Sequence, residues 1–294
     1  MTLLFGQGLV GHAVAASLAA SAPDSQRHSQ PYDWYSAAAR ADIRKDLARH
    51  VAAAGARVVS IVWAAGRAGF GATETDMAAE DVAFTEIVAF GQALEETGCR
   101  VALHLVSSAG GLFEGQSHVG LATLPAPQRP YGHAKLAQEA ALMASGLEAS
   151  IYRLSSVYGY LPGGRLGLIS TLMLNALEGR VTPITGHMDT RRDYVLAADT
   201  GAFIAGCIMR GDNGHDPFLL ASGQSASIVQ ILEAVQAALG EVPLDLDLAE
   251  APNNAADMSF DPAALPAGWE PTPLTKGIAQ TLMRIRTARA GHTN

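Results

Sequence analysis

Apolar positions along the chain follow two spacings, one typical of buried strands and one typical of helices. Short, largely apolar runs that predict strands buried on both faces lie at residues 2–5, 58–63, 101–106 and 149–154. Longer segments between them, which predict helices, lie at residues 12–20, 36–54, 79–96 and 131–145. Strands that alternate with helices indicate an α/β fold built on a doubly wound parallel sheet of the Rossmann type.

Composition narrows the class of protein. Apolar residues make up 49% of the 294 residues, enough for one large domain or a main domain with an appendage. The formal net charge is −8 and the Lys and Arg residues are scattered, which argues against nucleic acid or an anionic membrane as the main partner. We also expect no membrane partner because no apolar run reaches membrane-spanning length.

The cysteines and the first residues bear on the compartment. Cys99 and Cys207 are far apart and have no metal-ligand spacing, so we expect neither a disulfide framework nor a metal site. Residues 1–5 lack the basic start of a secretory signal peptide. Together these features favour a cytoplasmic protein.

A glycine-rich turn joins the first predicted strand to the first predicted helix. Gly6, Gly8 and Gly11 form the pattern G-x-G-x-x-G in the strand–turn–helix context that binds a dinucleotide. In that pattern the first glycine permits a tight turn, the second admits a pyrophosphate, and the third lets helix and strand pack closely. Leu9 and Val10 complete the turn, and the helix N-terminus offers N–H groups to the anion. The alternative is a glycine-rich turn without a ligand.

The acidic residue that would hold the adenosine ribose is missing. It is expected about 20 residues after the turn, but the count from Gly11 leads to Gln30, in a polar segment that makes a weak strand. Asp33 could hold the ribose, Arg27 could meet a 2′-phosphate, or the segment could be a remodelled surface loop. NAD and NADP are therefore both open.

Small and hydroxyl-bearing residues follow two other predicted strands. Ala64, Ala65 and Gly66 come after the strand at 58–63, and the backbone there can approach a cofactor closely. Ser107 and Ser108 come after the strand at 101–106. In an open α/β sheet, ligands bind at the carboxyl ends of the strands. We therefore expect these residues at the ligand site.

Tyr131 and Lys135 lie four residues apart on a predicted helix, so their side chains share one face. A free phenol is a poor base at neutral pH, and an ammonium a few ångströms away favours the phenolate. The pair can therefore move a proton on or off a hydroxyl. The alternative is an ordinary amphipathic helix, because this spacing by itself is common.

Several segments taken together resemble the extended short-chain dehydrogenase/reductase family, the nucleotide-sugar epimerases and dehydratases. The resemblance includes the glycine turn and the set of Ser108, Tyr131 and Lys135, and it covers nearly the whole chain. The later segments that carry it are residues 153–159, 192–195 with Asp199, 218–223, 261–265, and 268–272 with Gly277.

The resemblance implies roles for the central residues. Tyr131 would be the general acid/base on a sugar hydroxyl, and Ser108, or Ser107 in its place, would hydrogen-bond the same oxygen. Lys135 would bind the nicotinamide ribose and promote ionisation of Tyr131. The residues expected against the cofactor are Gly6, Gly8, Leu9, Val10, Gly11, Ala64, Ala65, Gly66, Ser107, Tyr131 and Lys135.

Two arginines would serve the substrate. By the same resemblance, Arg192 would hold the nucleoside diphosphate, a role that suits the paired donors of a guanidinium. A surface ion pair with Asp193 is the alternative for Arg192. Arg165 is a weaker candidate for the same anion.

The resemblance implies an NAD- or NADP-dependent epimerase or keto-reductase of a nucleoside-diphosphate sugar, and a homodimer formed through helices 79–97 and 131–145. A Rossmann core would comprise 1–159 with 193–222, and a smaller C-terminal substrate lobe would comprise 160–192 with 223–294.

Two departures from the family pattern affect this interpretation. The extended branch usually spaces its glycines G-x-x-G-x-x-G, and here the first is shifted by one. Ser108 is followed by Ala109-Gly110, not by the Asp-Glu pair of the family's 4,6-dehydratases, which argues against a dehydratase. The alternatives are a reductase of a small non-nucleotide carbonyl compound and a non-catalytic dinucleotide-binding regulator.

Overall fold

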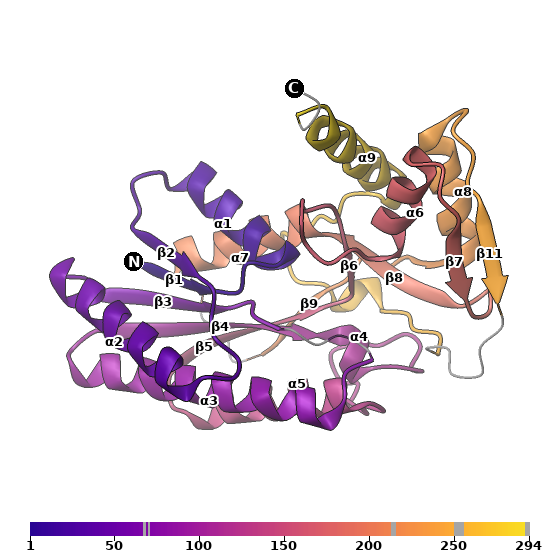
Figure 1. The fold of residues 1–294 in the computed structure, drawn as a ribbon. Coiled ribbons are helices and arrows are strands. Elements are labelled where there is room, and N and C mark those ends of the chain that lie inside the picture. Colours follow the sequence, from indigo (N-terminus) through magenta and orange to yellow (C-terminus); the bar gives the residue numbers. More distant parts are fainter. Residues whose placement is uncertain (67–68, 70, 213–215, 250–255, 292–294) are drawn as a thin grey trace.

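The computed structural model describes residues 1–66, 69, 71–212, 216–249 and 256–291 (Figure 1). Its largest element is a six-stranded sheet in the order β2-β1-β3-β4-β5-β9, in which all neighbouring strands are parallel. The strands are β1 (Thr2–Phe5), β2 (Arg27–Gln30), β3 (Val58–Trp63), β4 (Arg100–Ser108), β5 (Glu148–Leu154) and β9 (Phe218–Leu220). The predicted α/β fold with a parallel sheet is confirmed.

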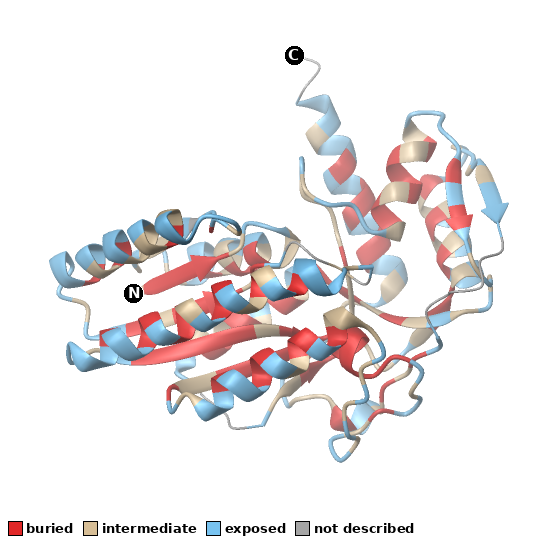
Figure 2. Cartoon of the chain, turned by 60° about the horizontal axis from the view of Figure 1, so that its bottom comes forward, coloured by how far each residue is buried: buried red, intermediate tan, exposed pale blue. Residues whose placement is uncertain are grey.

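Helices cover both faces of this sheet (Figure 1). One face carries α1 (Leu9–Ser21) and α7 (Ala197–Arg210), and the other carries α2 (Ala37–Ala53), α3 (Glu74–Glu96) and α5 (Pro130–Ala144). Successive side chains of a strand point to opposite faces, so Leu4 packs with α1 while Leu3 and Phe5 pack with α2 and α3. Figure 2 shows buried strands between helices whose outer faces are exposed.

Helix α3 begins earlier than its apolar spacing predicts. We expected it from residue 79, but it starts at Glu74 because Thr73 and Asp76 form a capping box. The Asp76 backbone N–H donates to Thr73 Oγ1 at 3.2 Å, and the Thr73 N–H donates to Asp76 Oδ2 at 3.1 Å. The extra turn extends α3 at the carboxyl edge of the sheet, where β3 ends.

In the described part of the chain, β2 is one of the two edge strands of the sheet, and the chain then passes through α2 to β3 on the far side of β1. Arg27 starts β2, and its Nη1 donates to the Ala22 carbonyl at 2.5 Å. It therefore lies at the amino end, away from the edge where ligands bind, and cannot meet a 2′-phosphate there.

Asp33 Oδ1 accepts from two backbone N–H groups, at 2.8 and 2.6 Å, just before α2.

The rest of the molecule forms a smaller lobe beyond the carboxyl ends of the strands (Figure 1). A three-stranded sheet contains β6 (Ser156–Tyr158), β8 (Arg191–Leu196) and β10 (Ser225–Ser227), and a two-stranded sheet contains β7 (Thr182–Thr185) and β11 (Leu246–Ala249). The helices α6 (Leu168–Leu177), α8 (Ile228–Leu239) and α9 (Leu274–Ala290) surround a separate buried cluster. The division into 1–159 with 193–222 and 160–192 with 223–294 stays a proposal.

The segment before α9 is bound to the core. Trp269 Nε1 donates to the Ala221 carbonyl at 2.7 Å, just after β9. Asp199, at the start of α7, accepts from the Thr272 N–H at 2.7 Å and from its hydroxyl at 3.0 Å.

Among the described helices, none is long and apolar enough to cross a membrane.

Candidate active site

The glycine turn leaves the first N–H groups of α1 open. Gly6 has φ +105°, and a Cβ there would collide with the backbone of Ala64. A Cβ on Gly11 would collide with the Gly6 carbonyl oxygen, so α1 lies directly against the turn. Gly8 precedes α1, and no described atom lies within 4 Å of where its Cβ would be. An anion such as a pyrophosphate can therefore approach this helix N-terminus.

A hollow of about 430 Å³, which we call the tyrosine cleft, lies beside this turn. The predicted site residues that line it are Gly8, Leu9, Val10, Ala64, Ala65, Gly66, Ser107, Ser108, Tyr131, Lys135 and Arg165. Gly6 and Gly11 shape the turn itself. Arg192 is not among the described residues that line the cleft. The structure thus brings together residues from the ends of β1, β3 and β4, from α5 and from the loop before α6.

Helix α5 places Tyr131 and Lys135 on one face. Pro130 starts the helix, Tyr131 is half-buried, and the Lys135 Nζ lies 5.7 Å from the centroid of the Tyr131 ring. The short helix α4 (Ala109–Leu112) packs against this face, and a Cβ on Gly111 would lie 3.0 Å from Tyr131 Cδ1. A Cβ on Gly132 would collide with the Gly111 carbonyl oxygen. These two glycines permit the close approach of α4 and α5 beside the Tyr131 ring.

Lys135 is held by a carboxylate. Its Nζ donates to Glu80 Oε1 at 2.5 Å and to Gln138 Oε1 at 3.0 Å. Burial lowers the pKa of Lys135, but the charges of Glu80 and Tyr131 raise it more, and the pKa lies above its ordinary value. Lys135 is therefore a fixed ammonium next to Tyr131.

Sequence reasoning missed Glu80, although the sequence contains a signal for it. Glu80 occupies a core-facing position of α3, on the same stripe as Met77, Phe84 and Ile87. An acid in the buried stripe of an amphipathic helix is unusual unless it is paired. The position therefore marks a buried cation partner, which the sequence does not identify.

The two serines that end β4 differ in what their hydroxyls can do. Ser108 Oγ accepts from the Gly111 N–H at 3.0 Å, which leaves its own proton available to a ligand oxygen. Ser107 is buried, and its hydroxyl donates to Glu139 Oε1 at 2.5 Å. Glu139 also accepts from Arg153 Nη2 at 2.6 Å. Ser107 thus supports the wall of the cleft, and Ser108 is the available donor.

Arg192 lies outside the tyrosine cleft. It is half-buried on β8, and burial lowers its pKa while the charge of Glu114 opposes this. Glu114 itself pairs with Arg129, with Nε and Oε2 2.9 Å apart. Asp193 is fully buried and accepts from the N–H and hydroxyl of Ser222, both at 2.8 Å. Asp193 therefore serves the fold and is not at the surface, where we had considered an ion pair with Arg192.

Arg165 belongs to the loop before α6. It is exposed, and its guanidinium lies over Gly69, where a Cβ would be 2.8 Å from Arg165 Cζ. Besides the tyrosine cleft, it lines a second hollow of about 710 Å³ that extends to Trp34, Tyr35, Asp76 and Glu80. Arg165 therefore stands at the border of two adjoining hollows.

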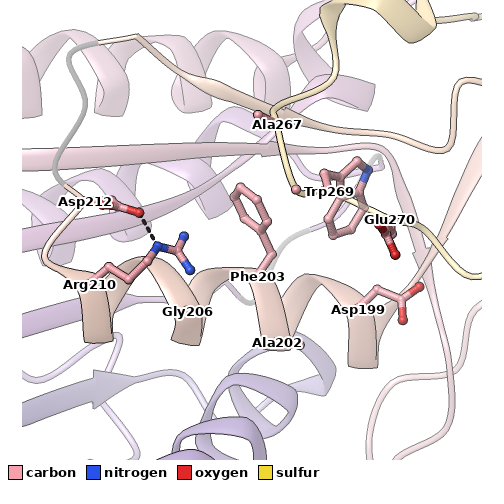
Figure 3. Close-up of a pocket in the computed structure, with 10 residues that line it drawn as sticks. Asp199, Ala202, Phe203, Gly206, Arg210, Asp212, Ala267, Trp269 and Glu270 are labelled. Carbon is pink, nitrogen blue, oxygen red and sulfur yellow. Dashed lines mark hydrogen bonds and ion pairs between the residues drawn. The ribbon is translucent and has the colours of Figure 1, made fainter.

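A further hollow of about 530 Å³ runs along α7 (Figure 3). The rings of Phe203 and Trp269 meet edge to face in it, with centroids 5.6 Å apart. Arg210 pairs with Asp212 at 2.5 Å, and Asp199 holds the segment before α9 as described above. These charged groups are engaged in the fold.

In the ranges that the structure describes, no group of three or more His, Cys, Asp or Glu could hold a metal ion.

Comparison with known proteins finds a curated relative that aligns with part of the chain. The dTDP-L-rhamnose 4-epimerase of Burkholderia thailandensis is 31% identical over an alignment of 172 residues that covers 54% of this chain and 46% of that protein. The chain thus aligns with about half the length of this curated relative.

Solved structures share the fold at low identity. The UDP-glucose 4-epimerase of Thermotoga maritima with UDP-glucose has a TM-score of 0.77 and 19% identity, covering 98% of this chain and 99% of that chain. The UDP-glucose-4-epimerase of Stenotrophomonas maltophila with bound NAD and formylated UDP-arabinopyranose has a TM-score of 0.77 and 18% identity, covering 99% of each chain.

A family model decides the assignment. The model described as the NAD dependent epimerase/dehydratase family matches residues 3–218. This range contains the glycine turn, the strand ends of the tyrosine cleft and the Tyr131–Lys135 pair. The chain therefore belongs to the NAD dependent epimerase/dehydratase family.

Proposed function

We propose that the chain is an NAD-dependent epimerase or keto-reductase that acts on a nucleoside-diphosphate sugar. One observation carries this proposal: Tyr131, Lys135 and Ser108 line the same cleft as the open N-terminus of α1. Membership of the family and the partial likeness to a dTDP-L-rhamnose 4-epimerase support it.

The residues present fit a dinucleotide. The α1 N-terminus suits the pyrophosphate, and Lys135 suits the nicotinamide ribose. The second hollow, with Trp34 and Tyr35 on its wall, suits the adenosine half, since an aromatic face can stack on a base. Asp76 lines the same hollow and would repel a 2′-phosphate, and the matching family is NAD dependent, so we propose NAD in preference to NADP. When bound, the dinucleotide supplies hydride transfer.

The side chains divide the proton chemistry. Tyr131 takes the proton of the sugar hydroxyl, and the Ser108 proton bonds the same oxygen. The ammonium of Lys135 lies beside Tyr131, with Nζ 5.7 Å from the ring centroid. Arg192 and Arg165 supply positive charge for the diphosphate of the substrate, Arg192 from β8 and Arg165 from the border of the cleft.

We further propose a cytoplasmic homodimer formed through α3 and α5. Val82 on α3 is 52% exposed and Met143 on α5 is 46% exposed. Apolar side chains that point outward from neighbouring helices suit such an interface.

One observation favours a second candidate. Arg165 lines the tyrosine cleft and Arg192 does not, so the two arginines do not meet in a single hollow among the described residues. A reductase whose substrate is a small carbonyl compound without a nucleotide does not need two arginines in one hollow, because there is no diphosphate to bind. A non-catalytic dinucleotide-binding regulator has less support, because the acid/base set is assembled in one cleft.

The proposed function is tested with Tyr131→Phe. We expect turnover of UDP- and dTDP-sugars to fall by roughly 100-fold or more, with NADH binding unchanged, because only the ionisable oxygen is removed. Products are followed by chromatography and NADH binding by fluorescence. The matched control is Tyr160→Phe, which removes a hydroxyl outside the cleft and should leave turnover unchanged. Equal turnover in Tyr131→Phe and wild type would show that Tyr131 is not the acid/base.

A further inference from the structure

The Lys135–Glu80 ion pair is buried between two helices. The side chains are 4% and 1% exposed, and Nζ and Oε1 are 2.5 Å apart. Taking two charges out of water is costly, and their attraction repays this cost only when the geometry is good and the remaining polar atoms are bonded. The amide of Gln138 satisfies a second Lys135 proton, at 3.0 Å. The lysine side of the pair is therefore well bonded.

The carboxylate side is not. Glu80 Oε2 is buried and has no hydrogen-bond partner among the described residues. Such an atom is rare in folded proteins, because an unbonded buried acceptor destabilises the fold. The oxygen faces Gly66, where a Cβ would lie 3.4 Å away, and Gly66 lines the tyrosine cleft. Glu80 also lines the second hollow. The unbonded oxygen thus lies where the two hollows adjoin.

We propose that Glu80 is a positioning residue for Lys135 and that its second oxygen accepts a hydrogen bond from a hydroxyl of the bound dinucleotide. The inference rests on the proposed function. A ribose carries two neighbouring hydroxyls, each able to donate and to accept. An ammonium that donates and a carboxylate that accepts, held together as one pair, complement such a diol. Glu80 would thereby stabilise the cofactor and the lysine together.

The charges around Lys135 determine how the loss of Glu80 changes the pKa of Lys135. Glu80 and Asp81 face it from α3, Tyr131 faces it from its own helix, and Arg165 lies across the cleft from the loop before α6. Glu80 makes the largest favourable contribution to the charged form, against the effect of burial. Without that carboxylate, burial dominates, and Lys135 loses its proton at lower pH. Cofactor binding should then weaken as pH rises.

The test compares Glu80→Gln with Asp81→Asn. Both remove one negative charge, but Asp81 bonds Gln138 at 2.8 Å and does not contact Lys135 in the described structure. NADH binding is measured by fluorescence titration between pH 6 and pH 10, and thermal melting checks the fold. We expect Glu80→Gln to bind NADH about 10-fold or more weakly, since a hydrogen bond to a charged group is lost, and to weaken further as pH rises. Wild type and Asp81→Asn should differ by less than about twofold.

A second variant separates the two roles. Glu80→Asp keeps the charge and withdraws the oxygens, so NADH should bind more weakly but with the pH dependence of wild type. It also serves if Glu80→Gln does not fold. NADH affinity in both Glu80 variants within about twofold of wild type, or an equal loss in Asp81→Asn, would overturn the inference. If wild type binds neither NADH nor NADPH, the proposed function itself falls, which is a distinguishable result.

Discussion

Two glutamates on α3 hold cations from neighbouring helices, and they do so differently. Glu86 is 24% exposed, and both of its oxygens are bonded: Oε1 accepts from Arg40 Nη2 at 3.0 Å, and Oε2 accepts from Arg40 Nε at 2.7 Å and from Arg44. Glu80 is 1% exposed, and only its Oε1 has a partner among the described residues. Glu86 thus fixes α2 against α3, while Glu80 keeps an acceptor beside the cleft.

Whether both carboxylate oxygens are bonded, more than charge, therefore distinguishes a structural ion pair from a functional one. The Glu86 cluster includes Tyr32, whose hydroxyl donates at 3.3 Å, and it holds the segment after the edge strand β2. Burial raises the pKa of Tyr32 to about 12, so this tyrosine stays a neutral donor. Both Glu86 oxygens are bonded within the fold, whereas Glu80 Oε2 has no partner among the described residues.

The largest stability effect is expected for Glu86→Ala. Arg40 is 4% exposed, and without its partner it becomes a buried uncompensated charge, at a cost of about 4 kcal/mol. The melting temperature should fall by roughly 10 °C, measured by calorimetry, while turnover per folded molecule stays at the wild-type value. The hydrogen bond from Arg40 lowers the pKa of Glu86, so the stabilisation is present above the ordinary pKa of 4.5 and is lost as pH falls through the lowered pKa.

Glu95→Ala is the matched control for this variant. Glu95 is exposed on the same helix, so its loss should change stability by less than about 0.5 kcal/mol. If Glu86→Ala and Glu95→Ala had the same melting temperature, Glu86 would not fix α2 against α3.

A buried histidine must be accounted for before the two glutamates are compared at acid pH. His104 is 1% exposed, its Nδ1 lies 3.0 Å from the Tyr152 hydroxyl, and burial lowers its pKa to about 4 from 6.5. Below pH 6.5 the unfolded chain binds a proton on His104 more readily than the folded chain does. The free energy of unfolding is therefore unaffected by this histidine above pH 6.5, and it falls by about 3 kcal/mol as pH drops toward 4. His104→Gln should remove this part of the pH dependence in urea denaturation. If the free energy of unfolding of His104→Gln fell between these pH values as steeply as that of wild type, His104 would not be the source of this pH dependence.

The smallest effect is expected for an exposed pair at the amino ends of β4 and β5. Arg100 and Glu148 are 63% and 37% exposed, with Nε and Oε1 2.7 Å apart. Both partners are hydrated, so Arg100→Gln should leave the urea denaturation midpoint nearly unchanged. A loss as large as that of Glu86→Ala would mean that exposure does not rank the ion pairs of this chain.

Much of the core could be predicted from the sequence because its signals are local. The apolar runs at 2–5 and 58–63 match β1 and β3 residue for residue, and the helix around Tyr131 is shifted by only one residue. The lobe was harder to predict, since its strands are short and pair across long stretches of chain. One missed signal was local: Ser227 and Gln230 form a capping box that starts α8.

The helices and strands, the glycine turn and the shared face of Tyr131 and Lys135 can be predicted from local sequence, because strand periodicity, backbone freedom and helical spacing act over a few residues. Which groups meet depends on how these elements pack together. Lys135 finds Glu80 55 residues away, Ser107 gives its proton to Glu139, and Arg165 reaches the cleft while Arg192 does not. The physical reason is that burial and hydrogen bonding depend on distance in space, which local spacing along a chain does not contain.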